Sequence, residues 1–161
     1  TMNQILGGGL GSRLGHSIRD EQGLAYGVGS WAVGMDSTGF FTAYLTTLSD
    51  YAPQALASVI HELEIISTEN VQNIELRLAQ ASIAGEQALS GMTYGDLAYR
   101  LTDLQVSGRP LSWHQTYLNR VLELTTDDIR SAASEYLVSN EWFVSISGPF
   151  QEENIFSESG D

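Results

Sequence analysis

The spacing of apolar residues along the chain first predicts a helix. Residues 3–21 carry apolar side chains at helical intervals, interrupted by Gly7, Gly8 and Gly9. We therefore expect one helix over this stretch, thinned at the three glycines, which let the backbone turn or a neighbouring segment approach closely. Gly23 follows directly after the stretch and is predicted to end the helix as its C-cap.

The pattern then changes from helical spacing to alternation. Residues 24–33 alternate between two faces, and glycines make one of these faces shallow. Residues 40–48 are rich in β-branched and aromatic side chains, and a Gly-, Asp- and Ser-containing turn separates the two stretches. This arrangement predicts two strands that pair antiparallel as a hairpin.

Helical spacing returns after the hairpin and continues for most of the chain. The first predicted helix is capped by Ser49 or Asp50 and ends near residue 68. Three more are predicted over about residues 71–90, 92–106 and 113–121, and a last helix begins at a capping box formed by Thr125 and Asp128. The second of these helices is predicted to bury a face rich in small residues, made of Ile74, Leu78, Ala81, Gly85 and Leu89.

One more strand is predicted near the end, because residues 141–147 alternate again before Gly148 and Pro149 stop the pattern. Strands grouped early, with one returning late, predict the α+β class with an antiparallel sheet packed on one face by several helices. Three strands make a narrow sheet for this many helices. Two explanations stay open: a strand ahead of residue 1 has been cut away, or a neighbouring domain supplies it. We assign residues 1–150 to one domain and residues 151–161 to an acidic tail.

Composition narrows the classes of function. The net charge is −13 and all seven basic residues are arginines, which disfavours nucleic acids and anionic membrane surfaces as partners. The chain has no cysteine, which excludes disulfides, thiol catalysis and cysteine-based zinc sites. No apolar run approaches the roughly 20 residues of a membrane span, and no signal peptide is visible. We expect a soluble protein.

Most catalytic motifs are absent from the sequence. A P-loop is excluded because the chain has no lysine, and no G-x-S-x-G nucleophile elbow is present. Gly27, Gly29 and Ala32 match a loose dinucleotide-binding pattern, but they lie within a predicted strand instead of between a strand and a helix. Nothing supports a Ser–His–Asp triad, although the spacing of the histidines does not exclude one.

The sequence comes nearer to a zinc-binding motif than to these catalytic motifs. His61 and Glu62 begin a near match to H-E-x-x-H and H-x-x-E-H, but both motifs need a histidine where Ile65 stands. One imidazole and one carboxylate do not hold a catalytic zinc ion, which takes three protein ligands. We therefore interpret His61 and Glu62 as a solvent-facing pair, and His16 and His114 as surface or helix-end residues. We predict no metal site in this chain.

Arg19 and Tyr26 form the one sharp constellation, R-x-x-x-G-L-x-Y, with Gly23 between them. The spacing allows two interpretations. Arg19 pairs with a nearby acid such as Asp20 or Glu21 while Tyr26 packs in the sheet. Alternatively, the helix end and the strand start bring guanidinium and phenol together, and both groups then donate hydrogen bonds to a carbonyl or an oxyanion.

The stretch I-L-G-G-G-L-G-S-R-L-G-H-S-I-R-D-E-Q-G-L-A-Y-G-V-G-S resembles the pitrilysin-type zinc peptidases of the M16 family. Weaker resemblance comes from residues 125–129 and 135–137 and from the closing Gly148 and Pro149. The resemblance implies repeated α+β domains in two halves that close around a peptide. One half carries an H-x-x-E-H zinc site, and the other, which this chain resembles, lacks it. The family's Arg and Tyr that reach the peptide correspond to Arg19 and Tyr26.

The resemblance thus implies an inactive, substrate-binding half of a bacterial M16 metallopeptidase. The sequence does not reveal the compartment, and the periplasm and the cytoplasm both stay open. Its implied partners are a zinc-bearing M16 domain or subunit, which holds the zinc cofactor, and a peptide substrate. Gly7, Gly8, Gly9 and Gly23 belong to the motif as structural residues. The alternative that the family also allows is a non-catalytic structural or assembly subunit, similar to the core proteins of the respiratory bc1 complex.

Overall fold

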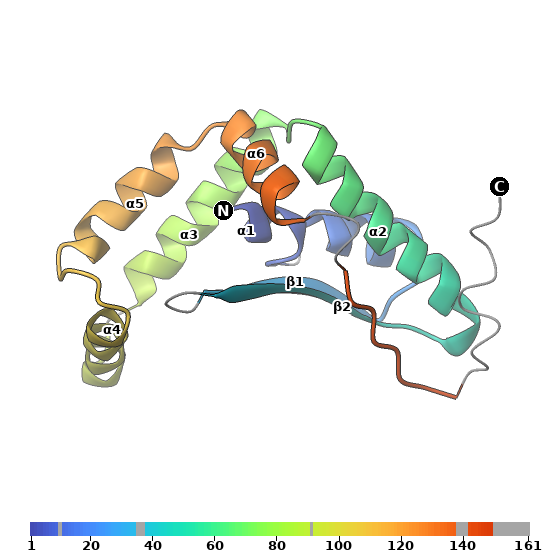
Figure 1. The fold of residues 1–161 in the computed structure, drawn as a ribbon, viewed down its shortest axis with the longest axis horizontal. Helices are drawn as coiled ribbons and strands as arrows, with labels where there is room; N and C mark the ends of the chain where they lie inside the picture. Colours follow the sequence, from blue (N-terminus) through green and yellow to red (C-terminus); the bar gives the residue numbers. More distant parts are fainter. Residues whose placement is uncertain (10, 35–37, 91, 138–141, 150–161) are drawn as a thin grey trace.

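The computed structural model describes residues 1–9, 11–34, 38–90, 92–137 and 142–149. In this part of the chain, helices form one layer and a two-stranded antiparallel sheet forms the other (Figure 1). The helical layer arches over one face of the sheet, while the helix α4 lies apart from it, beyond the turn end of the hairpin. The predicted α+β class, with helices on one face of an antiparallel sheet, is confirmed.

The hairpin predicted by alternation is formed by β1 (Gly27–Gly34) and β2 (Gly39–Thr46). Its register places Val28 opposite Leu45 and Gly29 opposite Tyr44. The face that packs against the core carries Val28, Phe41, Ala43 and Leu45. The opposite face carries the exposed residues Trp31, Val33, Phe40 and Tyr44. The hairpin therefore has one covered face and one open, largely aromatic face.

The opening segment is not the single helix that its apolar spacing predicts. α1 (Met2–Leu6) and the π-helix η1 (Gly15–Glu21) are separate helices, divided by a turn that starts at Gly7. The Gly7 carbonyl oxygen accepts a hydrogen bond of 2.9 Å from the Ser30 N–H, and a Cβ at Gly7 would lie 2.8 Å from the Gly29 carbonyl carbon. The helix breaks because the chain meets the backbone of β1 here, and only glycine leaves room for this contact.

Gly23 has the role that the sequence predicts at the end of η1. It adopts a φ of 66°, in the left-handed region that favours glycine. The Leu24 N–H then donates a hydrogen bond of 2.9 Å to the Ile18 carbonyl oxygen, which folds the chain back against the helix. This turn sets the direction in which the chain leaves η1 and enters β1.

The later helices follow the predicted order. The bounds are η2 (Ser49–Tyr51, a 3₁₀ turn), α2 (Ala52–Thr68), α3 (Asn73–Leu89), α4 (Tyr94–Val106), α5 (Trp113–Glu123) and α6 (Thr126–Tyr136). The predicted capping box of α6 is present. The Thr125 hydroxyl accepts a hydrogen bond from the Asp128 N–H at 3.3 Å, and the Asp128 carboxylate accepts one from the Thr125 N–H at 2.8 Å.

α3 buries a different face from the one that its sequence favours. The predicted residues Ile74, Leu78, Ala81, Gly85 and Leu89 are exposed, whereas Leu76, Ala79 and Ile83 are buried. The helix carries two apolar stripes, and periodicity does not rank them. The stripe with Leu76 is buried because α1 and α5 contact α3. The prediction of the buried face is therefore wrong, and the tertiary contacts explain why.

The predicted closing strand is also wrong in the described part of the chain, where residues 142–147 are not in a strand. Trp142 packs against the core, but Val144 on the same predicted side is exposed. A strand also needs a hydrogen-bonding neighbour, and among the described residues the sheet contains only β1 and β2. The predicted tail, residues 151–161, and the domain boundary at residue 150 lie outside the described residues.

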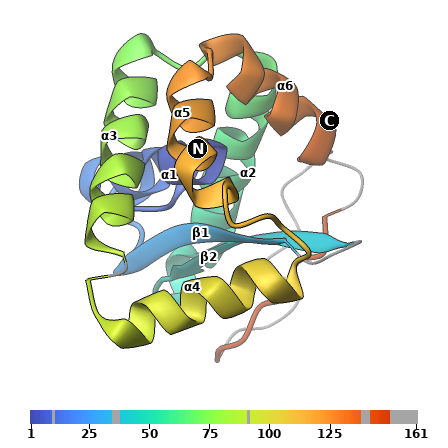
Figure 2. The ribbon, with the colours of Figure 1, turned by 90° about the vertical axis from the view of Figure 1, so that its left-hand side faces the viewer.

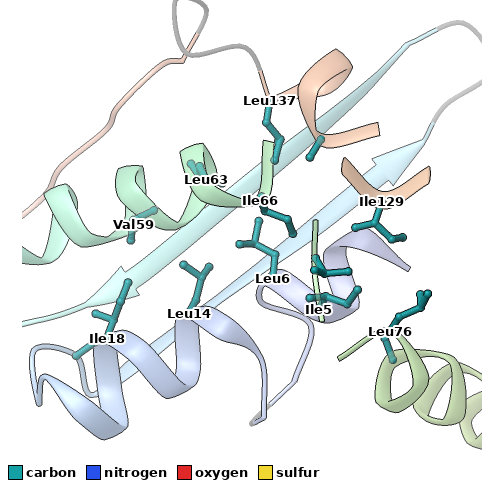
Figure 3. Close-up of a cluster of buried hydrophobic side chains, with 14 of the residues drawn as sticks. Ile5, Leu6, Leu14, Ile18, Val59, Leu63, Ile66, Leu76, Ile129 and Leu137 are labelled. Atoms are coloured by element: carbon teal, nitrogen blue, oxygen red, sulfur yellow. The ribbon is translucent and has the colours of Figure 1, made fainter. Parts of the chain in front are cut away.

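The core lies where the helices of the upper layer meet and rest on the sheet (Figures 2 and 3). Leu6 of α1, Leu14 just before η1 and Ile66 of α2 have no exposed surface, and Ile18 of η1 is equally buried. Burying such side chains is the largest favourable term in folding. Both parts of the opening segment are thereby anchored in the core, which determines where η1 presents its polar side chains.

An ion pair ties the opening segment to α3. The Arg13 guanidinium donates from Nε to Glu75 Oε1 at 2.6 Å and from Nη2 to Oε2 at 2.9 Å, and both side chains are mostly buried. Glu75 also accepts a hydrogen bond of 2.7 Å from the Gln72 N–H, so it caps α3. The hydrogen bond from Arg13 lowers the pKa of the Glu75 carboxyl below its ordinary value.

We expect Glu75→Gln to lower the free energy of unfolding at neutral pH by about 1–2 kcal/mol, because it removes a charged hydrogen-bond partner from Arg13. Since the folded pKa of Glu75 is lowered, its charge stabilises the fold above the unfolded pKa of about 4.3. This stabilisation is lost as the pH falls through the lower folded pKa. Urea unfolding at several pH values should show the difference between wild type and variant shrinking in that window. The exposed Glu64→Gln is the control, and an equal effect from it would contradict the prediction.

Candidate functional site

The site predicted from R-x-x-x-G-L-x-Y lies at the junction of η1 and β1. Arg19 is in the last turn of η1, and Tyr26 immediately precedes β1. The Leu24 N–H bond to Ile18 holds the two segments together between these residues. Tyr26 is itself fixed to the sheet, because its N–H donates to the Thr46 carbonyl oxygen at 2.9 Å. Core packing and the hairpin therefore position both backbones.

Arg19 has an acidic neighbour in the structure. Its Nε donates a hydrogen bond of 2.8 Å to Asp20 Oδ1, and both side chains are partly exposed. This bond raises the pKa of Arg19 and lowers the pKa of the Asp20 carboxyl from their ordinary values. The first interpretation of Arg19, pairing with Asp20, is therefore correct. A surface pair of this kind is weak, and it involves only one of the five N–H donors of the guanidinium.

Tyr26 does not pack in the sheet, contrary to the same interpretation. Its side chain is 92% exposed, the second highest value among the exposed tyrosines after that of Tyr94, at 94%. A phenol that projects into solvent from an anchored backbone gains little stability from burial. The arrangement leaves one phenol O–H and most of one guanidinium available to an outside group. Both are donors suited to a carbonyl oxygen or an oxyanion.

The helix that carries Arg19 has a feature that the sequence did not indicate. η1 is a π-helix, a form that is uncommon and often found at functional sites. Side chains five residues apart meet along it, as in His16 Nε2 to Glu21 Oε1 at 3.3 Å. Gln22 at its end accepts a hydrogen bond of 2.9 Å from the Ser58 hydroxyl of α2. No pattern in the sequence separates this helix from an ordinary α-helix.

The open face of the hairpin lies next to this junction. Trp31 and Tyr44 pack against one another across the strands, with ring centroids 4.9 Å apart, and both remain partly exposed. On the same face, a Cβ added at Gly27 would meet no atom within 4 Å. The face is therefore shallow at its Tyr26 end and aromatic farther along.

The four glycines of the motif differ in their surroundings. Gly7 is held against β1 and Gly23 has a positive φ, as described above. A Cβ at Gly8 would lie 2.8 Å from the Gln4 Cα, whereas Gly9 has only the end of the Gln4 side chain nearby, at 3.7 Å. The close contacts at Gly7 and Gly8 explain the turn, and Gly9 is exposed.

The donors for a metal site do not come together in the described residues. Among them no group of three His, Cys, Asp or Glu side chains could hold a metal ion. His61 of α2 is exposed, and His16 forms the pair with Glu21. The side chain of His114 lies outside the described part. The described donor set therefore does not fit a catalytic zinc ion.

Among the described residues, no helix combines the length and the apolar character needed to cross a bilayer.

Several known proteins that are similar to this chain in sequence belong to one group of zinc protease-related proteins. A family model described as "Peptidase M16 inactive domain" matches residues 1–83, just over half of the chain. An uncharacterised zinc protease of Streptomyces coelicolor is 26% identical over 151 residues, which cover 94% of this chain and 33% of that protein. A Helicobacter pylori protein named as a non-peptidase homolog is 26% identical over 137 residues, or 85% of this chain and 32% of that protein.

The fold comparison leads to the same group of proteins. The crystal structure of a peptidase M16 inactive domain from Pseudomonas fluorescens matches with a TM-score of 0.77 and 28% identity, over 83% of this chain and 32% of that chain. The chain spans about a third of the length of the curated relatives described here. Both Arg19 and Tyr26 lie within the residues that the family model matches.

Proposed function

Because this chain belongs to the peptidase M16 family, as an inactive domain of zinc protease-like proteins, we propose that it is the substrate-binding half of a zinc metalloendopeptidase. The observation that carries the proposal is the junction of η1 and β1, where Arg19 and Tyr26 present hydrogen-bond donors to solvent from anchored backbones. In this proposal the domain alone hydrolyses nothing, because the described residues bring together no group of side chains that could hold the zinc ion.

In this proposal the guanidinium of Arg19 and the phenol of Tyr26 hold the carbonyl oxygen of the scissile peptide bond. The charge on that oxygen grows as the carbonyl carbon becomes tetrahedral, so donors placed against it bind the transition state more tightly than the substrate. Arg19 keeps its bond to Asp20, which orients the guanidinium, and uses its remaining N–H groups for the peptide. Tyr26 needs no rearrangement, because its side chain is already free of the sheet.

The zinc ion belongs to the partner in this scheme. The described residues do not fit a zinc site, so the metal-binding ligands come from a second M16 domain or subunit. When bound there, zinc supplies Lewis-acid chemistry. That the relatives are about three times as long is consistent with a further domain in the full protein.

The hairpin offers a place for the rest of an extended peptide. Extended peptides often bind by adding a strand to an open sheet edge. Among the described residues, the edge of β1 opposite to β2 has no strand neighbour. The Ser30 N–H on that side already donates to the Gly7 carbonyl oxygen. Pairing with a peptide is therefore restricted to the β1 backbone on either side of Ser30, between Gly27 and Val33.

A second candidate function is a non-catalytic structural or assembly subunit of the same fold. Two observations favour it: Arg19 already has an acidic partner in Asp20, and one relative is named as a non-peptidase homolog. In that case the exposure of Tyr26 serves a contact between subunits, and peptide hydrolysis does not depend on it.

The test is peptidase activity with added zinc, measured first on this chain alone and then on its mixture with a zinc-bearing M16 domain of the same organism. We expect no activity from either component alone and hydrolysis from the mixture. Size-exclusion chromatography of the mixture serves as the control for assembly. Activity of this chain alone would contradict the proposal, and a stable complex that hydrolyses nothing would favour the structural subunit.

A further inference from the structure

Two arginines share one tryptophan ring on the side of the molecule where α4 leads into α5. The Cζ atom of Arg109 and the Cζ atom of Arg120 each lie 4.8 Å from the centroid of the Trp113 ring. Cation–π contacts of this kind hold a guanidinium against the ring face and leave its N–H edge free. We call these three residues the Arg–Trp–Arg cluster.

The backbone of the cluster is held in place. Gly108 has a φ of 64° after α4, and the Arg109 N–H then donates to the Leu104 carbonyl oxygen at 2.9 Å, as in a Schellman cap. The Trp113 N–H donates to the Pro110 carbonyl oxygen at 2.8 Å. The turn therefore positions Arg109, whereas α5 positions both Trp113, its first residue, and Arg120 two turns later.

The cluster is unusual in so acidic a chain. Arg13, Arg19 and Arg130 each form an ion pair with a carboxylate. Arg109 and Arg120, like the two remaining arginines, form none within the described part of the chain, although the sequence holds 20 acidic residues and seven basic ones. What distinguishes Arg109 and Arg120 from those two is the ring that holds both guanidinium groups. Two guanidinium groups that are ordered by a ring but have no carboxylate partner are prepared to bind one from outside.

We propose that the Arg–Trp–Arg cluster is a docking site for an acidic polypeptide segment, bound through two carboxylates. The two Cζ atoms are at most twice 4.8 Å apart, since both are measured from one centroid. Acidic side chains two residues apart in an extended segment are separated by about 6.6 Å, which is below this upper limit for the distance between the two Cζ atoms. A long, densely charged polyanion is disfavoured, because the whole chain carries a net charge of −13.

The neighbourhood adds an apolar contact for the same segment. Leu111, between Arg109 and Trp113, is largely exposed. In an extended segment, an apolar side chain two positions from one of the acidic residues lies on the same face as they do and meets Leu111. This site is separate from Arg19 and Tyr26, and the inference does not depend on the proposed peptidase function.

The experiment titrates the 161-residue chain with the synthetic peptide acetyl-Leu-Gly-Glu-Gly-Glu-amide at low salt, monitored by calorimetry and by the indole N–H resonance of Trp113. We expect binding that shifts this resonance and weakens with added salt. Replacing either arginine, in Arg109→Gln or Arg120→Gln, is expected to raise the Kd about tenfold. Arg77→Gln is the matched control, because it removes one exposed charge from α3 and leaves the cluster intact.

Several outcomes would overturn the proposal. The first is no binding at millimolar peptide. The second is equal binding of a peptide with glutamine in place of both glutamates. Equal weakening by Arg77→Gln would mean that only the overall charge matters. Inorganic phosphate that binds as tightly as the peptide would mean a general anion site instead of a polypeptide site. Circular dichroism of each variant verifies that the fold is retained.

Discussion

Arg19→Ala is expected to reduce kcat/KM of the reconstituted peptidase about 100-fold, and Tyr26→Phe by a similar factor. Removing one donor from a developing oxyanion commonly costs this much, because the donor acts mainly in the transition state. Neither substitution should change the free energy of unfolding by more than about 0.5 kcal/mol, since both side chains are at the surface. Steady-state kinetics of the mixture with the zinc-bearing domain measures the effect.

The chain offers a matched control for each of these variants. Tyr94→Phe removes a phenol that is as exposed as that of Tyr26, and Arg77→Ala removes an exposed arginine of α3. Both controls should leave kcat/KM within about twofold of the wild type. If Arg19→Ala and Tyr26→Phe behave like their controls, the assigned roles are wrong and the structural-subunit function is favoured.

Gly7→Ala is expected to destabilise the fold by about 3 kcal/mol, the largest stability effect of any substitution considered for this chain. The added Cβ would lie 2.8 Å from the Gly29 carbonyl carbon and closer still to Ser30. Real Cβ atoms do not approach backbone so closely, so the turn must move away from β1. That movement breaks the hydrogen bond from the Ser30 N–H and strains the one from the Ser30 hydroxyl to Asn3, of 2.8 Å.

Denaturant unfolding of Gly7→Ala measures this effect, and Gly11→Ala is its control. A Cβ at Gly11 meets no atom within 4 Å, so the second variant should change the free energy of unfolding by less than about 0.5 kcal/mol. Similar losses in both variants would indicate that the turn needs glycine for its flexibility, and the close approach to β1 would then not be the cause.

Local patterns in the sequence were sufficient for several elements. The alternation of residues 24–33 and 40–48 predicted the hairpin, and the pair Thr125 and Asp128 predicted the cap of α6. Gly23 was placed correctly at the end of a helix. These features depend on hydrogen bonds and dihedral angles within a few residues, which the nearby side chains determine.

The predictions that failed all involved contacts between distant segments. The helix over residues 3–21 breaks because Gly7 meets β1, and nothing near Gly7 in the sequence indicates that strand. α3 carries two apolar stripes, and only the positions of α1 and α5 decide which one is buried. Residues 142–147 alternate like a strand, but a strand also needs a neighbour to pair with, and that depends on a distant segment.

For the candidate site, too, the sequence determined one part and the tertiary structure determined the other. The sequence by itself determined the spacing R-x-x-x-G-L-x-Y of Arg19, Gly23 and Tyr26, because a motif is a matter of residue types and spacing. Only the tertiary structure decided that Tyr26 projects into solvent while Arg19 bonds to Asp20. The Arg–Trp–Arg cluster likewise emerged only from the structure, because Gly108 and the turn after it bring Arg109 to Trp113. Side-chain exposure and pairing depend on which surfaces the folded chain covers, and that is a property of the packing of all elements together.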